Sequence, residues 1–224
     1  MSETPLVNPT PATRPAAAAL LPGWYGKLPH LGDFASRRLP EAFVSGWDAW
    51  LRHALASSRE ALGPRWLQGY LVAPIVRFWL PPGLLGESSW TGLLMPSIDR
   101  VGRHFPLTVA QPDVTLAQVQ AAPGWFEALD AAMRRALDVS FTVEDLEQAL
   151  AQAVRDAPLP APAPGGEGGG PWGPWGPWDG AAALAQAAAP GSHWWFARAG
   201  GELRCRFDAL PPVVAMTELL GACA

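Results

Sequence analysis

Residues 69–80 read GYLVAPIVRFWL, an apolar run rich in β-branched and aromatic side chains. The length of this run and the Pro-Pro-Gly that follows it favour a strand over a buried helix, and Pro74 indicates a bulge or break within it. SSWTGLLMP (88–96) and HFPLTVAQ (104–111) have the same character and predict two more strands. Because a Pro/Gly-rich connection joins the first two strands, we expect them to pair in antiparallel fashion.

Upstream of these strands, the sequence predicts one short strand and one long helix. GWYGKL (23–28) has strand character, and the chain then turns through Gly32. Pro40 suits a first helical position, and apolar residues recur at helical spacing until Gly63 and Pro64 end the segment. This is the clearest helix in the sequence.

Downstream of the three strands, the patterns are mainly helical. Asp113 is expected to cap a short helix before Pro123, and the apolar residues between 126 and 137 mark an amphipathic helix. Thr142 and Asp145 have the spacing of a capping box, which predicts the start of a further helix.

The end of the chain predicts two more strands and completes the fold class. SHWWFARA (192–199) and ELRCRF (202–207) have strand character, and the AGGE between them is a hairpin turn signal. An Ala-rich helix near 180–189 precedes them, and a closing helix near 212–220 follows. This order of elements predicts an α+β fold with a mainly antiparallel central sheet of about five to six strands, covered by helices.

The composition indicates a packed globule with unstructured attachments. With 224 residues, an apolar fraction of 49% and 12 Trp, the chain can bury a sizeable core. Its 25 Pro and 23 Gly exceed the average share of these residues, so part of the chain is expected to be unstructured. We therefore predict a disordered N-terminal lead (1–22) and a single α+β domain (23–224), interrupted by a Pro/Gly/Trp-rich insert at about 156–180.

The insert contains a short repeat of Pro and Trp. PWGPWGPW (171–178) places Trp172, Trp175 and Trp178 three residues apart. In a polyproline II conformation, which has three residues per turn, these indoles would line one edge. They would then dock on the domain or on a partner, and the sequence leaves open which of the two.

Charge and targeting signals exclude several classes of protein. A net charge of −4 argues against binding to nucleic acid or to an anionic membrane surface. The first residues lack the basic start and apolar run of a signal peptide, and no stretch approaches the roughly 18 apolar residues of a membrane span. We therefore expect a cytoplasmic protein without membrane insertion. Cys205 and Cys223 lack metal-site spacing and fit a reducing compartment.

One charged segment lies between the second and third predicted strands. PSIDRVGRHFPL (96–107) gathers several ionisable side chains in a chain of which only 16% is charged. In one interpretation Asp99 pairs with Arg103 in a structural clasp, because Arg–carboxylate pairs can fix a loop. Arg37 and Arg38 are the other candidate partners of Asp99. A partner-binding patch is compatible with this clasp, since loops on a rigid sheet commonly carry recognition.

An enzymatic alternative is a metal-dependent phosphohydrolase that uses Asp33 and Asp99, aided by His30 or His104. The spacing of these residues does not single out such a site. The sequence also lacks a G-x-S-x-G nucleophile elbow, a paired-histidine metal motif and a phosphate-binding loop. We therefore predict no catalytic residue, no metal and no cofactor.

Four stretches resemble the TagF family, also called ImpM, which comprises accessory proteins of bacterial type VI secretion. They are GWYGKLPHLGDFASRRLP (23–40), the W-D-x-W-L pattern at 47–51, PSIDRVGRHFPLTVA (96–110) and WWF (194–196). The resemblance covers about 23–140 and returns near 192–220, and it does not extend to the Pro-Trp repeat.

The resemblance implies regulation rather than chemistry. TagF-like proteins are cytoplasmic post-translational repressors that hold the secretion machine inactive, and a forkhead-associated scaffold protein is a partner in some systems. Some relatives are fused to a PP2C-type phosphatase domain, of which this chain shows no motif. The residues that match the family pattern, for partner binding or as a structural clasp, are Lys27, Gly32, Asp33, Phe34, Arg37, Pro96, Ser97, Asp99, Gly102, Arg103 and Pro106.

Overall fold

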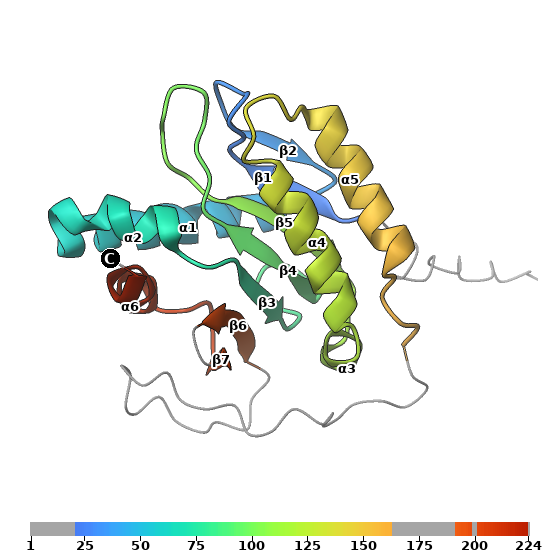
Figure 1. Cartoon of the computed structure of the whole chain (residues 1–224). Coiled ribbons are helices and arrows are strands. Elements are labelled where there is room, and N and C mark those ends of the chain that lie inside the picture. The colour runs from blue at the N-terminus through green and yellow to red at the C-terminus, as the bar shows by residue number, and fades with distance from the viewer. Residues whose placement is uncertain (1–20, 163–190, 199–200, 224) are drawn as a thin grey trace, which may run out of the picture.

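The computed structural model describes residues 21–162, 191–198 and 201–223. Figure 1 shows a central β-sheet with helices on either side of it. The predicted lead lies almost wholly outside the described residues, as do the Pro-Trp repeat and the helix predicted near 180–189. These features, and the organisation into a single domain, stay predictions.

Within the described residues the sheet has seven strands, and every neighbouring pair is antiparallel. Their order is β2-β1-β5-β4-β3-β6-β7. The strands are β1 (Gly23–Gly26), β2 (Ala35–Arg37), β3 (Val76–Leu80), β4 (Trp90–Met95), β5 (Leu107–Pro112), β6 (Ser192–Arg198) and β7 (Gly201–Phe207). The predicted α+β fold with a mainly antiparallel sheet is confirmed. The additional strand is β2, a three-residue strand at the edge of the sheet, of which only Ala35 is partly buried.

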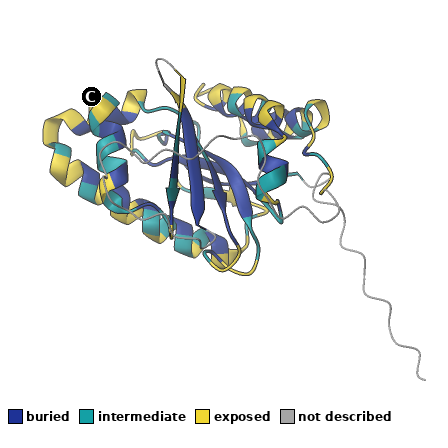
Figure 2. Cartoon of the chain, turned by 90° about the horizontal axis from the view of Figure 1, so that it is seen from below, coloured by how far each residue is buried: buried dark blue, intermediate teal, exposed yellow. Residues whose placement is uncertain are grey.

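Helices cover both faces of this sheet, as Figure 2 shows from below. The helices are α1 (Glu41–Leu62), α2 (Trp66–Val72), α3 (Leu116–Gln120), α4 (Pro123–Arg135), α5 (Val143–Asp156) and α6 (Val213–Cys223), with a 3₁₀ turn (Gly63–Arg65) between the first two. One core packs α1, α2 and α6 against the sheet, and the other packs α3, α4 and α5. Among the described residues, none of the helices combines the length and apolar character that a bilayer crossing requires.

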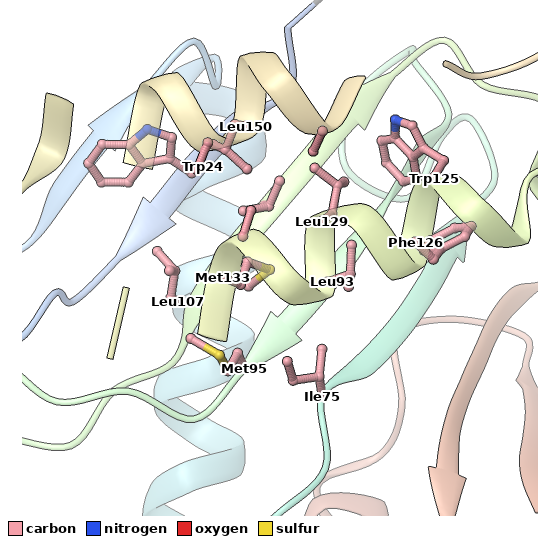
Figure 3. Close-up of a cluster of buried hydrophobic side chains, with 14 of the residues drawn as sticks. Trp24, Ile75, Leu93, Met95, Leu107, Trp125, Phe126, Leu129, Met133 and Leu150 are labelled. Atoms are coloured by element: carbon pink, nitrogen blue, oxygen red, sulfur yellow. The ribbon is translucent and has the colours of Figure 1, made fainter. Parts of the chain in front are cut away.

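The two cores explain why the central strands are apolar along their whole length. Successive side chains of a strand point to opposite faces. In β3, Phe78 belongs to the core under α1, whereas Trp79 belongs to the core under α4. In β4, Leu93 and Leu94 divide in the same way. Figure 3 shows Leu93 beneath the side chains that α4 and α5 contribute.

The first half of the predicted strand at 69–80 is wrong, because residues 66–72 form α2 and β3 begins only at Val76. Trp66 and Tyr70 lie four residues apart, and their rings stack with centroids 4.8 Å apart on the buried side of this helix. The apolar run therefore contains the end of one helical face as well as a strand. Pro74, expected to interrupt the strand, lies in the connection between the two elements.

The helix caps agree with the predictions in one case and differ in another. The capping box of Thr142 and Asp145 at the start of α5 is confirmed. The predicted cap at Asp113 is wrong, because α3 begins after Thr115, which forms a capping box with Gln118. Asp113 has a positive φ of 58° and belongs to the turn that precedes the cap.

The first residues of the predicted insert are more ordered than expected. Leu159 is buried in the core beneath α4 and α5. The carbonyl of Pro160 accepts a hydrogen bond of 2.7 Å from the side-chain amide of Gln118. The chain therefore continues to pack on the globule after α5 ends at Asp156.

Two of the family-like motifs meet in one aromatic cluster between α1 and the sheet. The ring of Trp47 lies 4.9 Å from that of Trp50 and stacks on that of Trp194 at 5.9 Å. The indole N–H of Trp47 donates to the Thr108 hydroxyl of β5 at 2.8 Å, so this buried polar group is satisfied. The cluster fixes α1 across the middle of the sheet.

Candidate functional site

Three connections lie together at one end of the sheet, at the top of Figure 1. They are the β1–β2 connection (27–34), the β4–β5 connection (96–106) and the α4–α5 connection (136–142). The first two are neighbours because β1 pairs with β5. The two long motifs that carry the family resemblance therefore meet in space, and most of the predicted site residues lie here.

Asp99 is the centre of this region. Its side chain is buried, with 1% of the residue exposed. One carboxylate oxygen accepts hydrogen bonds from Lys27 Nζ at 2.5 Å and from Arg103 Nε at 2.6 Å. The other accepts from the backbone N–H groups of Val101 and Arg103 at 3.0 and 2.9 Å. Asp99 thus closes its own loop and fastens that loop to the end of β1.

These donors decide the charge of Asp99. Burial alone would raise the pKa of the carboxyl group, since it disfavours the charged form. The hydrogen bonds from Lys27, from both the backbone and side chain of Arg103 and from the Val101 backbone oppose this effect. Together they hold the pKa of Asp99 well below its usual range, so the carboxylate stays ionised in the folded protein.

This lowered pKa predicts a loss of stability in acid. The unfolded chain binds a proton at Asp99 near its reference pKa of about 3.9, whereas the folded chain resists protonation. The contribution of Asp99 to the free energy of unfolding should therefore be complete above about pH 5 and decline below pH 4. Urea unfolding at pH 7, 5 and 3 measures this decline. The double variant Lys27→Met/Asp99→Leu, which lacks the titrating pair, should decline less; equal slopes in the two proteins would contradict the prediction.

Lys27 connects Asp99 to a group of aromatic rings. The residue is 4% exposed, and its Nζ lies 4.8 Å from the centroid of the Phe34 ring, a distance typical of a cation–π contact. Phe34 in turn stacks on Tyr25 at 5.7 Å and meets Phe105 edge-on at 4.8 Å. These rings shield the ammonium group from water, which strengthens its pairing with the carboxylate.

Arg103 and Arg100 join the two loops directly. The guanidinium of Arg103 donates to the backbone carbonyl of Gly32 at 2.5 Å, in addition to its bond with Asp99. The backbone N–H of Arg100 donates to the carbonyl of Leu31 at 2.8 Å. The β1–β2 and β4–β5 connections therefore hold each other in place, and the outer part of Arg103 remains in solvent with 57% of its side chain exposed.

Ser97 adds a second set of bonds on the buried side. Its hydroxyl donates to the Lys27 carbonyl at 2.8 Å, and its backbone N–H donates to the Tyr70 hydroxyl at 3.1 Å. The Tyr70 hydroxyl donates in return to the Ser97 carbonyl at 2.9 Å. Tyr70 is not among the predicted site residues, because it lies outside the family-like motifs and 27 residues before Ser97 in the sequence.

Glycine and proline shape the β4–β5 connection. Gly102 has a φ of +81° and donates its N–H to the Asp99 carbonyl at 2.9 Å, which turns the chain back. Pro106 is buried, and its carbonyl lies so close to Gly26 that a Cβ atom there would be 2.1 Å away. Pro96 is half-buried where β4 leads into the loop.

Two predicted residues lie in this region without joining the ion-paired group. Arg37 is exposed on β2, and Asp33 is exposed and accepts a hydrogen bond from the N–H of Phe34 at 2.8 Å. Arg38 pairs instead with Glu147 of α5 at 2.6 Å. Of the three arginines considered as partners for Asp99, the structure pairs it with Arg103. The sequence did not reveal Lys27 as the second partner.

The arrangement does not favour the two-aspartate metal site. The two carboxylate oxygens of Asp99 together already accept four hydrogen bonds, two each. A cation would therefore have to displace Lys27 and Arg103. Asp33 faces solvent and bonds within its own loop. In the part of the chain that the structure describes, no three His, Cys, Asp or Glu side chains are grouped as metal ligands.

His104, the other candidate in that site, is placed as a packing residue. Its ring meets those of Trp66 and Tyr70 edge-on, with centroids 5.8 and 5.4 Å apart. Burial lowers its pKa, and the nearby positive charge of Arg59 adds to this effect. The imidazole is therefore neutral at physiological pH. It packs with Trp66 and Tyr70, the second of which hydrogen-bonds Ser97.

The sequence matches the model of a known family, and the structure is similar to a solved structure. Residues 23–153 match the model of the TagF N-terminal domain, described as type VI secretion system-associated. The structure is similar to the crystal structure of PA0076 from Pseudomonas aeruginosa PAO1, with 38% identity and a TM-score of 0.68 over 89% of this chain and 93% of that one. No match was found among curated proteins. Since the TagF match spans more than half of the sequence, the chain belongs to the TagF family of type VI secretion system-associated proteins.

Proposed function

We propose that this chain is a post-translational repressor of type VI secretion, which acts in the cytoplasm by binding a component of the secretion machine. Family membership supports the link to secretion. One observation favours binding over catalysis: the Asp99 carboxylate is buried between Lys27 and Arg103 with every acceptor position used. The polar residues that most resemble a reacting group therefore rigidify two loops, and we propose that the protein catalyses no reaction.

A forkhead-associated scaffold protein of the secretion system is the partner we propose. Loops held in a fixed shape bind with a smaller loss of conformational entropy than mobile ones, because less of the chain is ordered on association. The β1–β2 and β4–β5 connections meet this condition through the Arg103–Gly32 and Arg100–Leu31 bonds. Their outer surface is available for contact, since Gly32, Asp33 and residues 100–103 are exposed.

Deletion of the gene tests the proposal in cells. Type VI secretion into the medium should rise, while transcripts of the secretion genes stay unchanged, because the proposed repressor acts on proteins that have already been made. Expression of the wild-type chain from a plasmid should restore the low level. Secretion that is unaltered by deletion, or that changes only together with transcript levels, would contradict post-translational repression. Titration of the purified chain with purified scaffold protein, followed by calorimetry, tests the partner itself.

A further inference from the structure

We propose that the Pro-Trp repeat (171–178) docks, through its indole rings, in a groove that α3, α4, β6 and β7 of the same chain form. The sequence alone leaves open whether the repeat contacts the domain or a partner, and the positions at which the described chain stops and resumes favour the domain. This contact does not depend on the proposed function, since the family resemblance does not extend to the repeat.

The groove lies on the α4 side of the sheet and has a volume of about 190 Å³. Four elements form its walls: Gln120 of α3, Pro123 and Phe126 of α4, Trp195 of β6 and Arg204 of β7. Figure 1 shows α3 and the β6–β7 pair together in the lower half of the molecule. Small-molecule sites typically have volumes of roughly 300–1,000 Å³, so this groove suits one bulky side chain rather than a cofactor.

The alternation of side chains along β7 explains why the groove is open. Cys205 and Phe207 point to the core beneath α1 and α6, whereas β7 contributes no described residue to the core beneath α4. Glu202 and Arg204 therefore face the α4 side, where both line the groove.

The described chain stops and resumes beside this groove. Before the repeat, the Pro160 carbonyl is held by the side chain of Gln118 in α3 at 2.7 Å, two residues from Gln120 on the groove wall. After the repeat, Gly191 leads into β6, and a Cβ atom there would lie 2.3 Å from the Phe207 carbonyl oxygen of β7. The repeat is therefore joined at one end to α3 and at the other to the β6–β7 pair, and both form walls of the groove.

The connections to the repeat are short. Nine residues (163–171) separate Pro162 from Trp172, and twelve (179–190) separate Trp178 from Gly191. Nine fully extended residues span about 30 Å at most. A tether of this length gives an effective concentration in the millimolar range, so a contact too weak to hold a separate partner is sufficient within one chain.

The groove offers the groups that an indole ring binds. The Arg77 guanidinium lies 5.6 Å from the centroid of the Phe126 ring, so the groove already holds a cation over an aromatic ring. Glu202 accepts a hydrogen bond from Arg204 at 2.6 Å and lies 3.9 Å from Arg77, which orients both guanidinium groups. Trp is the aromatic side chain that cations prefer, and a guanidinium plane can stack on its face. The exposed carboxylate can also accept the indole N–H, which a docked Trp must satisfy.

Amide spectra of the ¹⁵N-labelled full chain test the contact. The triple variant Trp172→Ala/Trp175→Ala/Trp178→Ala should shift the amide signals of residues 119–126 and 202–204, because their aromatic neighbours are removed. The signals of α1 (41–62) should stay in place, which shows that the fold is intact. Groove signals that are identical in the wild type and the triple variant would overturn the inference.

A peptide added to the triple variant tests the groove itself. The probe is acetylated and amidated Gly-Pro-Trp-Gly-Pro-Trp-Gly-Pro-Trp-Gly, which should return the groove signals toward their wild-type positions and saturate. The matched peptide with Leu for each Trp should not. Arg204→Ala in the triple variant should weaken peptide binding about threefold or more, through the loss of one cation–π contact. Arg134→Ala, which removes an ion-paired arginine at the far end of α4, should leave binding unchanged. Equal binding by these two variants would overturn the groove as the docking site.

Two further measurements separate the other occupants. Sedimentation should show that the wild type and the triple variant have the same mass. A wild-type dimer that the triple variant dissolves would place the repeat on a second copy and overturn a contact within one chain. Loss of scaffold binding in the triple variant, with its groove signals unchanged, would place the indoles on the partner and overturn the inference as well.

Discussion

Replacement of Asp99 by alanine is expected to lower the free energy of unfolding by about 3–5 kcal/mol, the range found when one partner of a buried ion pair is removed. The loss arises because Lys27, with 5% of its side chain exposed, keeps its charge without the carboxylate that faces it. The backbone N–H groups of Val101 and Arg103 lose their acceptor as well. Urea unfolding followed by tryptophan fluorescence measures the change at neutral pH.

An exposed ion pair of the same chain is the control for this experiment. Asp130→Ala breaks the pair with Arg134 on α4, where the arginine side chain is 62% exposed. Such surface pairs contribute about 0.3–0.5 kcal/mol, so this variant should unfold almost as the wild type does. If Asp99→Ala also falls within about 1 kcal/mol of the wild type, the central ion pair does not hold the loops together as we describe.

The double variant Lys27→Met/Asp99→Leu tests the physical cause. When both charges are replaced by apolar side chains of similar size, no unpaired charge stays buried, and most of the stability should return. Recovery of at least half of the loss would show that the unpaired Lys27 causes the damage. A double variant as unstable as Asp99→Ala would instead show that the backbone bonds of Asp99 are the main contribution.

The parts of the fold that the sequence predicted are those with strong local periodicity. The regular spacing of Phe43, Trp47 and Leu51 predicted α1 because that helix buries one face along its whole length. The apolar runs at 88–96 and 104–111 predicted β4 and β5 because both faces of those strands are buried. Short elements gave no such signal: β2 has three mostly exposed residues, and α2 has only seven.

The contacts of the candidate site are also of two kinds: local contacts, which the sequence predicts, and contacts between distant residues, which it does not. The pair of Asp99 and Arg103 was predictable, since four residues separate them within one turn. Lys27 lies 72 residues from Asp99, and their contact depends on the pairing of β1 with β5, which no local pattern specifies. The bond between Tyr70 and Ser97 depends in turn on where α2 packs. Resemblance to a family drew attention to Lys27, but physical reasoning from the sequence did not give its partner.

Gly26→Ala is expected to lower the free energy of unfolding by about 3 kcal/mol or more, because overpacking and backbone strain each contribute about 1–3 kcal/mol. Gly26 ends β1 with a φ of +140°, and a Cβ atom there would lie 2.1 Å from the Pro106 carbonyl oxygen and 2.9 Å from Leu107 Cα. Backbone atoms cannot move aside as a flexible side chain would. The strand end must therefore shift, and Lys27 must shift with it.

Gly83→Ala separates the two causes of this loss. Gly83 also has a positive φ, of +91°, but a Cβ atom there would meet nothing within 4 Å. Its replacement should cost only the strain of a left-handed backbone, about 1–2 kcal/mol. Equal losses in the two variants would mean that the close approach at Gly26 has no energetic consequence. A clearly larger loss at Gly26, measured by urea unfolding, would show that only a glycine lets β1 approach Pro106 closely enough for Lys27 to reach Asp99.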